Sequence, residues 1–173
     1  MTKMNERGVA WEAGALRLLS HSPESPHCTR VLDAFVVPGR SSDGSHLCFV
    51  MPVYGGDLEA LVKFQDGTPF SYPLAKRIIL HTLRGLAHAH RRHVVHTDLK
   101  HSNIFFDTQL STADIERWIE KDPSRKHPPE TSYEGAVVQA AVSQPFPMIS
   151  EEEALRATYL LGDYGCGEGL PIS

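Results

Sequence analysis

The arrangement of apolar and polar residues predicts a chain that mixes helices with short strands. Apolar residues recur at the spacing of an amphipathic helix at residues 5–19 and again at residues 71–92. Shorter apolar runs bounded by Gly, Pro, Ser or Asp predict strands at residues 30–37, 46–53, 94–95, 104–106 and 159–161. We therefore expect an α+β fold in which the first two strands form an antiparallel hairpin.

The first predicted helix carries an acidic residue on its apolar side. Its stripe consists of Val9, Ala13, Leu16 and Leu19, and Glu12 falls within that stripe on the helical wheel. A carboxylate that faces a core is costly unless a cation pairs with it. Glu12 is therefore expected to meet a cation from elsewhere, or to reach solvent at the helix rim or a groove edge.

The helix at residues 71–92 is the longest that the pattern predicts. Ser71 can cap its first turn, and Pro73 suits a position where no backbone N–H is needed. Six apolar residues at helical spacing form its predicted buried face: Leu74, Ile78, Ile79, Leu83, Leu86 and Ala87.

Composition and charge limit the kinds of core, partner and metal site that the chain can have. The chain has 173 residues, 41% of them hydrophobic, which suffices for one core of ordinary size. A net charge of −4 does not favour a nucleic-acid partner, and no apolar run is long enough to cross a bilayer. Three scattered cysteines without a C-x-x-C pair predict neither a zinc site nor a disulfide framework. We expect an intracellular protein of the cytoplasm, the nucleus or both.

The candidate chemistry lies in a polar loop between the strands at residues 94–95 and 104–106. Asp98, Lys100 and Asn103 stand there at the spacing that phosphoryl transfer needs. Asp98 can accept the proton of an attacking hydroxyl, and Lys100 can neutralise charge on the transferring group. Asn103 can hold Mg²⁺ through its amide oxygen. A polar turn between two strands is the alternative interpretation of this spacing.

The loop His96-Thr97-Asp98-Leu99-Lys100-His101-Ser102-Asn103 resembles the catalytic loop of eukaryotic protein kinases. Thr97 stands where most members have Arg, and His-Thr-Asp is similar to the form found in the SR-protein kinase branch and its fungal relatives. Lys100 resembles the serine/threonine class. It also disfavours a small-molecule phosphotransferase, which is a third class to consider.

A second motif supports the resemblance. Asp163-Tyr164-Gly165 follows the last predicted strand and is similar to the Asp-Phe-Gly motif of kinases. The resemblance implies that Asp163 binds Mg²⁺ on the phosphates of ATP, and that Glu12 pairs with the strand lysine that holds those phosphates.

The resemblance also assigns a nucleotide-binding segment after the strand at 46–53. Met51 corresponds to the gatekeeper position or lies next to it, and the backbone of Pro52, Val53 and Tyr54 is expected to contact adenine. Asp57 is expected to approach the ribose, although its role as the N-cap of the next helix, through about Lys63, would explain it alone.

The kinase resemblance divides the chain into four parts. Residues 1–53 resemble part of a small lobe, and residues 54–106 the hinge and the start of the large lobe. Residues 107–158 form an insertion, and residues 159–173 hold the metal-binding motif. Within the insertion we predict a helix at 111–121, an extended segment at 125–133, an apolar run of open type at 136–142 and a helix starting at Ser150. The insertion either docks a partner or substrate, or is passive.

Some kinase parts are absent from this sequence. It contains no G-x-G-x-x-G, no strand lysine before Glu12 and no activation segment after Gly165. We therefore expect this chain by itself to have little or no kinase activity and marginal stability. The resemblance implies a serine/threonine kinase that uses ATP and Mg²⁺ on a protein substrate, with Ser/Arg-rich proteins as a candidate class. A non-catalytic kinase-like binding module is the alternative.

Overall fold

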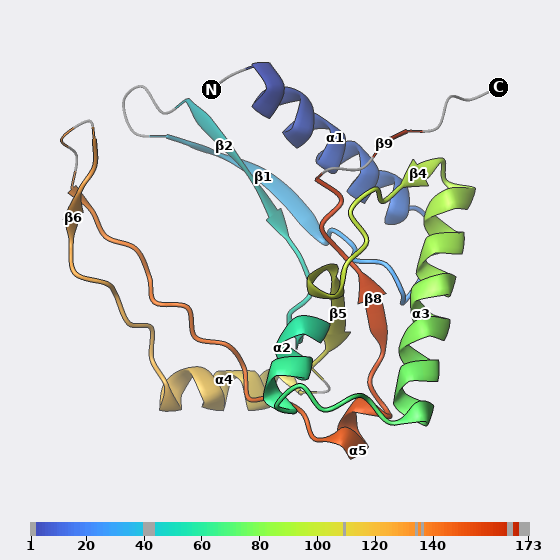
Figure 1. The fold of residues 1–173 in the computed structure, drawn as a ribbon. Helices are drawn as coiled ribbons and strands as arrows, with labels where there is room; N and C mark the ends of the chain where they lie inside the picture. Colours follow the sequence, from blue (N-terminus) through green and yellow to red (C-terminus); the bar gives the residue numbers. More distant parts are fainter. Residues whose placement is uncertain are drawn as a thin grey trace. The chain divides into compact units, whose positions relative to one another are not determined.

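The computed structural model describes residues 3–39, 44–108, 110–133, 135, 137–165 and 168–169, with side chains from residue 11 to residue 165 within these ranges. The chain divides into two compact units (Figure 1). The first unit comprises Met1–Thr108 and Met148–Ser173, and the second comprises Gln109–Pro147.

The first unit combines helices with small antiparallel sheets, so the predicted α+β class is confirmed. Its helices are α1 (Lys3–Leu19), α2 (Leu58–Phe64), α3 (Tyr72–Arg91), the 3-10 helix η1 (His101–Asn103) and α5 (Glu151–Ala154). Its strands are β1 (Asp33–Pro38), β2 (Ser45–Val50), β3 (Tyr54–Asp57), β4 (Val94–Val95), β5 (Ile104–Asp107), β8 (Tyr159–Leu161) and β9 (Glu168–Gly169).

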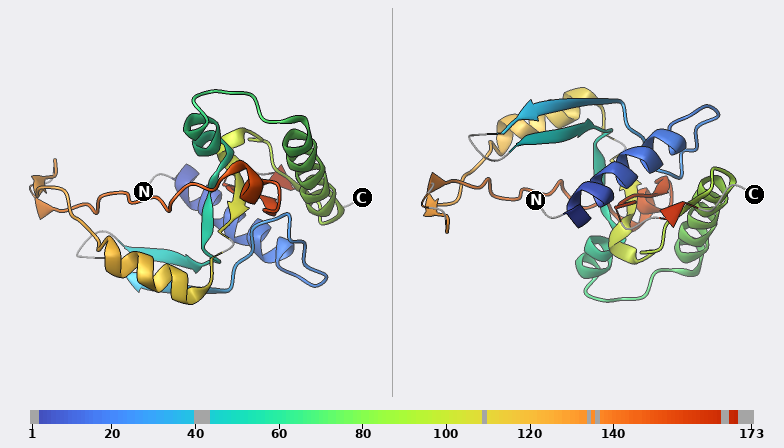
Figure 2. Two further views of the ribbon diagram at one scale, coloured as in Figure 1. Left: turned by 90° about the horizontal axis from the view of Figure 1, so that it is seen from below. Right: turned by 90° about the horizontal axis from the view of Figure 1, so that it is seen from above.

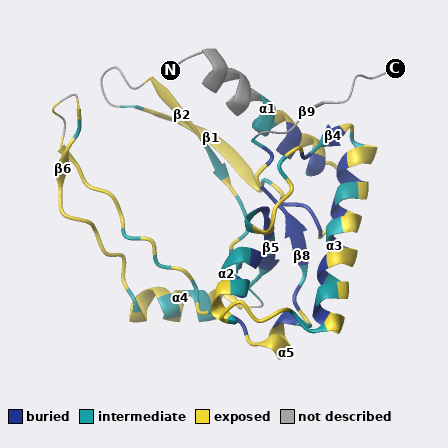
Figure 3. Ribbon diagram, viewed as in Figure 1, coloured by how far each residue is buried: buried dark blue, intermediate teal, exposed yellow. Residues whose placement is uncertain are grey.

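Strands β1 and β2 form the predicted antiparallel hairpin, with Asp33 opposite Val50 and Pro38 opposite Ser45. Figure 3 shows that this hairpin is largely exposed, in contrast to the buried β5 and β8. Strand β2 ends at Val50, three residues earlier than predicted, so that Met51, Pro52 and Val53 connect it to β3.

The central sheet has the order β3-β5-β8, with all pairs antiparallel. The pattern did not predict β3, because its sequence Tyr-Gly-Gly-Asp has no apolar alternation. Its glycines have a packing reason: a Cβ on Gly55 would lie 2.6 Å from the ring of Phe106, which is fully buried. Small residues therefore let β3 lie over an aromatic side chain.

Helix α3 packs along β8, and Figure 2 shows the two side by side. Its buried residues are Leu74, Ile78, His81, Gly85, His88 and Ala89. The predicted buried face was partly wrong, since Ile79 and Leu83 are 59% and 57% exposed. Ser71 does stand at the N-cap position, but its hydroxyl makes no capping hydrogen bond.

Two buried histidines hold the start of β8. The Tyr159 N–H donates to Nδ1 of His81 over 3.1 Å, and Nδ1 of His27 donates to the Tyr159 carbonyl over 3.0 Å. The two imidazole rings lie 4.3 Å apart. Polar side chains thus occupy core positions that the apolar pattern did not predict, because each finds a backbone partner there.

The C-terminal end of α1 is tied to α3. Leu16 and Leu19 are buried as predicted, together with Ala15, while Val9 lies outside the described side chains. Arg92 donates to the carbonyls of Leu18 and His21 over 3.1 and 2.9 Å. A cation at the Leu18 carbonyl stabilises the end of α1, and the second bond to His21, just beyond the helix, fixes the same segment against α3.

The second unit contains α4 (Thr112–Lys121), β6 (Glu130–Thr131) and β7 (Val137–Val138). Helix α4 begins with a capping box between Ser111 and Asp114, and the Trp118 ring lies 4.7 Å from that of Phe146. The predicted helix at 111–121 is confirmed, and the apolar run of open type at 136–142 contains strand β7, which pairs with β6.

Residues 148–158, which we assigned to the insertion, belong to the first compact unit. Ile149, Ala154 and Ala157 are buried in its core. The helix predicted at Ser150 is confirmed as α5, with a capping box between Ser150 and Glu153. Among the described helices, none has both the length and the apolar character needed to cross a membrane.

Gly85 is predicted to tolerate no side chain. A Cβ there would lie 2.4 Å from the His27 carbonyl oxygen, so Gly85→Ala should lower the free energy of unfolding by about 1–3 kcal/mol. Gly14→Ala in α1 is the matched control, because its Cβ meets nothing within 4 Å and should stabilise the helix by about 0.5–1 kcal/mol. Urea unfolding measures both, and equal effects would contradict the close contact at Gly85.

Acid is predicted to destabilise the fold partly through His81. Burial, followed by the nearby His27, lowers the pKa of His81 to about 4. Because the unfolded chain takes up this proton near pH 6.5 and the folded chain only near pH 4, this contribution to stability is complete above pH 6.5 and is lost as the pH falls toward 4.

His81→Gln should therefore flatten the fall of the unfolding free energy between pH 7 and pH 4. His90→Gln is the control, because His90 is exposed on the same helix. Parallel pH profiles for wild type and His81→Gln would show that His81 carries no such linkage.

Candidate functional site

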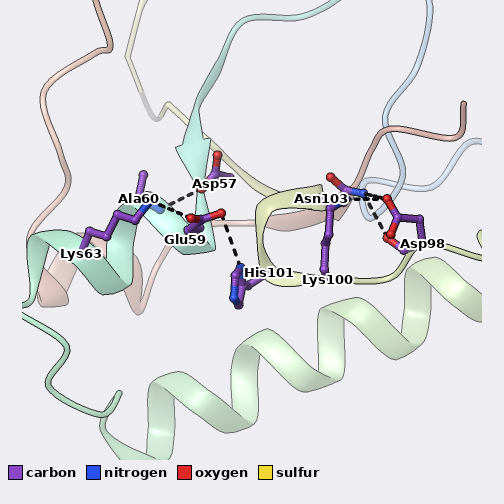
Figure 4. Close-up of polar contacts among 8 residues, drawn as sticks. All are labelled: Asp57, Glu59, Ala60, Lys63, Asp98, Lys100, His101 and Asn103. Carbon is purple, nitrogen blue, oxygen red and sulfur yellow. Dashed lines mark hydrogen bonds and ion pairs between the residues drawn. The ribbon is translucent and has the colours of Figure 1, made fainter.

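The polar loop between β4 and β5 draws three predicted residues together. Lys100 Nζ donates to Asp98 Oδ2 over 2.6 Å, and Asn103 Nδ2 donates to the same oxygen over 3.1 Å and to the Asp98 carbonyl over 3.0 Å (Figure 4). Asn103 is only 4% exposed. The loop therefore presents one carboxylate whose orientation is set by an ammonium and a buried amide.

Asp98 is poised to act as an anion. The hydrogen bond from Lys100 is the main cause that lowers the pKa of Asp98 below its ordinary value, and the bond from Asn103 adds to it. Since the side chain is partly exposed, its other oxygen can meet a molecule from solution. An ionised, oriented carboxylate at a surface can accept a hydrogen bond from a hydroxyl group.

The pairing of β5 with β8 places Asp163 beside this loop. Ile104 lies opposite Leu161, so the residues just before β5 meet the residues just after β8. The Gly162 N–H donates to the Asn103 carbonyl over 3.0 Å. The antiparallel register thus unites two motifs that lie about sixty residues apart in the sequence.

His96 also bonds to Gly162, the residue that joins β8 to Asp163. It is almost fully buried, and its Nε2 donates to the Gly162 carbonyl over 2.9 Å. Gly162 leaves no room for a side chain, because a Cβ would lie 2.5 Å from the Phe105 ring. The apolar pattern does not predict this role of Gly162, although a glycine directly before Asp163 is a usable signal.

The backbone at both ends of the site lies in the left-handed region. Thr97 and Asp163 each have φ of 59°. For a β-branched residue such as Thr97 this conformation is uncommon and costs about 1–3 kcal/mol. Strained residues persist where the surrounding contacts hold them. Thr97 follows His96 and Asp163 follows Gly162, and these two neighbours are hydrogen-bonded to each other.

Glu12 faces a second carboxylate. Burial is the larger cause that raises the pKa of Glu12, and the negative charge of Asp163 raises it further. A Cβ on Gly165 would lie 3.4 Å from Asp163 Oδ1 and 3.9 Å from Glu12 Oε2, so both carboxylates border the same space. Among the described residues no Lys or Arg pairs with Glu12, so the cation expected there does not come from this part of the chain.

The residues present suit a hard divalent cation held partly by a ligand. In the part of the chain that the structure describes, no three His, Cys, Asp or Glu side chains converge as a metal cage. Mg²⁺ typically takes one or two protein oxygens and completes its shell with water and phosphate. Asn103 and Asp163 can supply such oxygens at the β5–β8 junction.

The segment predicted to bind nucleotide runs from the end of β2 into α2. Met51 and Pro52 are half-buried, and Val53 is exposed. Tyr54 pairs with Asp107 in the sheet, and its hydroxyl lies 2.9 Å from Oγ1 of Thr29.

Asp57 caps helix α2, as predicted. Its Oδ1 accepts from the Ala60 N–H over 2.8 Å. Two residues after Asp57, Glu59 Oε2 lies 3.8 Å from His101 Nδ1 (Figure 4). Helix α2 is thereby connected to η1, the helix that carries Asn103, so that the nucleotide-binding candidate segment and the polar loop belong to one packed region.

Comparison with known proteins agrees with this geometry. The family model for the protein kinase domain matches residues 2–115. Cyclin-dependent kinase 10 of Homo sapiens is 40% identical over 77 residues, which cover 42% of this chain and 21% of that protein, and the Bos taurus protein matches to the same extent. A probable serine/threonine-protein kinase of Dictyostelium discoideum is 38% identical over 50 residues, 29% of this chain and 3% of that protein.

The chain spans about a fifth of the length of the cyclin-dependent kinase 10 proteins that it matches. The family match nevertheless covers more than half of this chain and includes the loop from His96 to Asn103. On this evidence the chain belongs to the protein kinase domain family.

Proposed function

We propose that the natural polypeptide containing this sequence is a serine/threonine protein kinase that transfers the γ-phosphoryl group of ATP to a protein hydroxyl. The observation that carries the proposal is the hydrogen-bonded set of Asp98, Lys100 and Asn103, joined to Asp163 through the bond from Gly162 N–H to the Asn103 carbonyl.

Each residue has a chemical role in this proposal. The hydroxyl oxygen of the substrate forms a bond to the γ-phosphorus while the bond to the bridging oxygen of ADP breaks, and Asp98 accepts the hydroxyl proton. Lys100 lies 2.6 Å from Asp98, where its charge can neutralise the transferring group. Asn103 and Asp163 would hold Mg²⁺, which when bound offsets the negative charge of the phosphates.

Glu12 and the segment after β2 complete the nucleotide site. The Glu12 carboxylate borders the same space as Asp163, where a lysine that grips ATP could pair with it. Met51, Pro52, Val53 and Tyr54 would lie along the adenine. Asp57 would approach the ribose with the oxygen that does not cap α2.

The catalytic loop and a relative support the serine/threonine specificity that we propose, and the loop also suggests a substrate class. Lys100 is similar to the serine/threonine class, and a relative from Dictyostelium discoideum is named as a probable serine/threonine-protein kinase. Thr97 resembles the SR-protein kinase branch, so we propose Ser/Arg-rich proteins of the cytoplasm or nucleus as the substrate class.

One observation favours a second candidate, a kinase-like binding module without catalysis. In the described part of the chain Glu12 has no cation partner, and this ion pair positions the phosphates in kinases. A module of this kind would bind ATP or a protein without transferring phosphate, which separates it experimentally from the first proposal.

Asp98→Asn in the full natural polypeptide tests the catalytic proposal. Loss of the proton acceptor should lower kcat for phosphorylation of a Ser/Arg-rich peptide by roughly 100-fold to 10,000-fold. Affinity for ATP should change little, because Asp98 contacts the hydroxyl rather than the nucleotide. Transfer of ³²P from labelled ATP and equilibrium binding measure the two quantities.

The matched control is Asp66→Asn, the same charge change at an exposed turn. Phosphorylation that survives Asp98→Asn undiminished would contradict the role of Asp98. ATP binding without any transfer by the wild-type protein would favour the binding module.

Asp57 allows its capping and ribose roles to be separated. Asp57→Ala should lower the free energy of unfolding by about 1 kcal/mol, since it removes the acceptor for Ala60 N–H. Asp57→Asn keeps a capping oxygen and should cost only a few tenths of that.

If the carboxylate also bonds the ribose, Asp57→Asn should weaken ATP binding roughly fivefold at nearly unchanged stability. Equal ATP affinity in wild type and Asp57→Asn would leave capping as the whole role of this residue.

A further inference from the structure

The hydroxyl of Tyr164 has a specific buried partner. Tyr164 is fully buried, and its Oη donates to the Sγ of Cys28 over 3.5 Å. A phenol hydroxyl in a core is costly unless it is hydrogen-bonded. The hydroxyl of Tyr164 therefore makes a contact that a phenylalanine in this motif could not make, a hydrogen bond to a second segment of the chain.

Cys28 is in turn hydrogen-bonded to helix α3. Its thiol, 4% exposed, donates to the Gly85 carbonyl over 3.3 Å. The two neighbours of Cys28 both bond to the backbone of Leu161 in β8. Thr29 N–H donates to the Leu161 carbonyl over 2.7 Å, and Leu161 N–H donates to the His27 carbonyl over 3.0 Å. The sulfur thus has a fixed place between β8 and α3.

The two hydrogen bonds at Cys28 require that both the Tyr164 hydroxyl and the Cys28 thiol carry a hydrogen. Burial is the main cause that raises the pKa of the Cys28 thiol, so the thiol keeps its hydrogen at neutral pH. The hydroxyl can then donate to sulfur while the thiol donates to the carbonyl oxygen.

Asp163 stands between two anchored neighbours. Gly162 is held by His96 and by the Asn103 carbonyl, and Tyr164 is held by Cys28 and lies with its ring 4.8 Å from that of His96. Asp163 itself has φ of 59°. A strained conformation persists only when the contacts on both sides hold it.

We propose that Cys28 is a positioning residue for Asp163, acting through the hydrogen bonds from the Tyr164 hydroxyl to its thiol and from its thiol to the Gly85 carbonyl. This inference rests on the proposed function, because it concerns how the residue assigned to Mg²⁺ is held. It assigns a role to a cysteine that lies about 135 residues before the metal-binding motif.

The test compares Tyr164→Phe, Cys28→Ala and Cys28→Ser in the full natural polypeptide. The readout is the ratio of ATP affinities with and without Mg²⁺, which isolates the metal-dependent part of binding. Tyr164→Phe and Cys28→Ala both remove the hydrogen bond between the Tyr164 hydroxyl and the Cys28 thiol, and each should lower this ratio roughly fivefold. Cys28→Ser should restore it, since a serine hydroxyl can both accept and donate.

Two controls remove one group of the same kind elsewhere. Tyr159→Phe deletes a buried hydroxyl that bonds the Ala154 carbonyl over 2.9 Å, and Cys48→Ala deletes a half-buried thiol on the exposed hairpin. Both should leave the Mg²⁺ ratio unchanged. The double variant Cys28→Ala with Tyr164→Phe should lose no more than Cys28→Ala alone, because the Tyr164 hydroxyl acts only through the bond to the thiol that Cys28→Ala already removes.

A second readout needs no nucleotide. Hydrogen exchange of the Gly162 amide, followed by NMR, reports opening of the junction before Asp163. It should accelerate roughly fivefold in Tyr164→Phe and stay constant in Tyr159→Phe.

The outcomes separate the inference from the proposed function. An unchanged Mg²⁺ ratio in Tyr164→Phe and Cys28→Ala would overturn the positioning role while leaving the kinase proposal intact. A wild-type protein whose ATP affinity does not respond to Mg²⁺ would contradict the kinase proposal. Gly162 exchange then decides the positioning role alone: acceleration in Tyr164→Phe supports it, and equal rates overturn it.

Discussion

The antiparallel pairing of β5 with β8 is the constraint on which the candidate site depends. It ends in the hydrogen bond from the Gly162 N–H to the Asn103 carbonyl, and it brings Asp163 to the loop that holds Asp98. A shift of one residue in this register would turn alternate side chains to the opposite face. In the observed register only glycine fits at position 162, because a Cβ there would lie 2.5 Å from the Phe105 ring.

Helix α3 is the rigid support behind this sheet. Its buried face is unusually polar and small, with His81 accepting from the backbone of Tyr159 and Gly85 admitting the segment at His27 and Cys28. Close backbone approach, rather than apolar burial alone, therefore connects the segment at His27 and Cys28 with α3 and β8. The same approach brings the Cys28 thiol within reach of Tyr164, so packing of the scaffold and orientation of the site are one arrangement.

Much of the fold could be predicted because its signals are local. The apolar spacing of α1, α3 and α4 and the capping sequences at Ser111 and Ser150 lie within a few residues of the structure they specify. Strand β3 and the buried histidines could not be predicted in this way. Their places depend on partners far along the chain, Phe106 for Gly55 and Tyr159 for His81.

The sequence by itself determined the chemical content of the site, because Asp98, Lys100 and Asn103 lie within one loop and their spacing sets what they can do. It also determined the second motif, Asp163-Tyr164-Gly165. Only the tertiary structure decided that Glu12 faces Asp163, and that the Tyr164 hydroxyl meets Cys28. These contacts arise where separate elements pack together, and a distance in space between residues far apart in the chain is not encoded in local patterns.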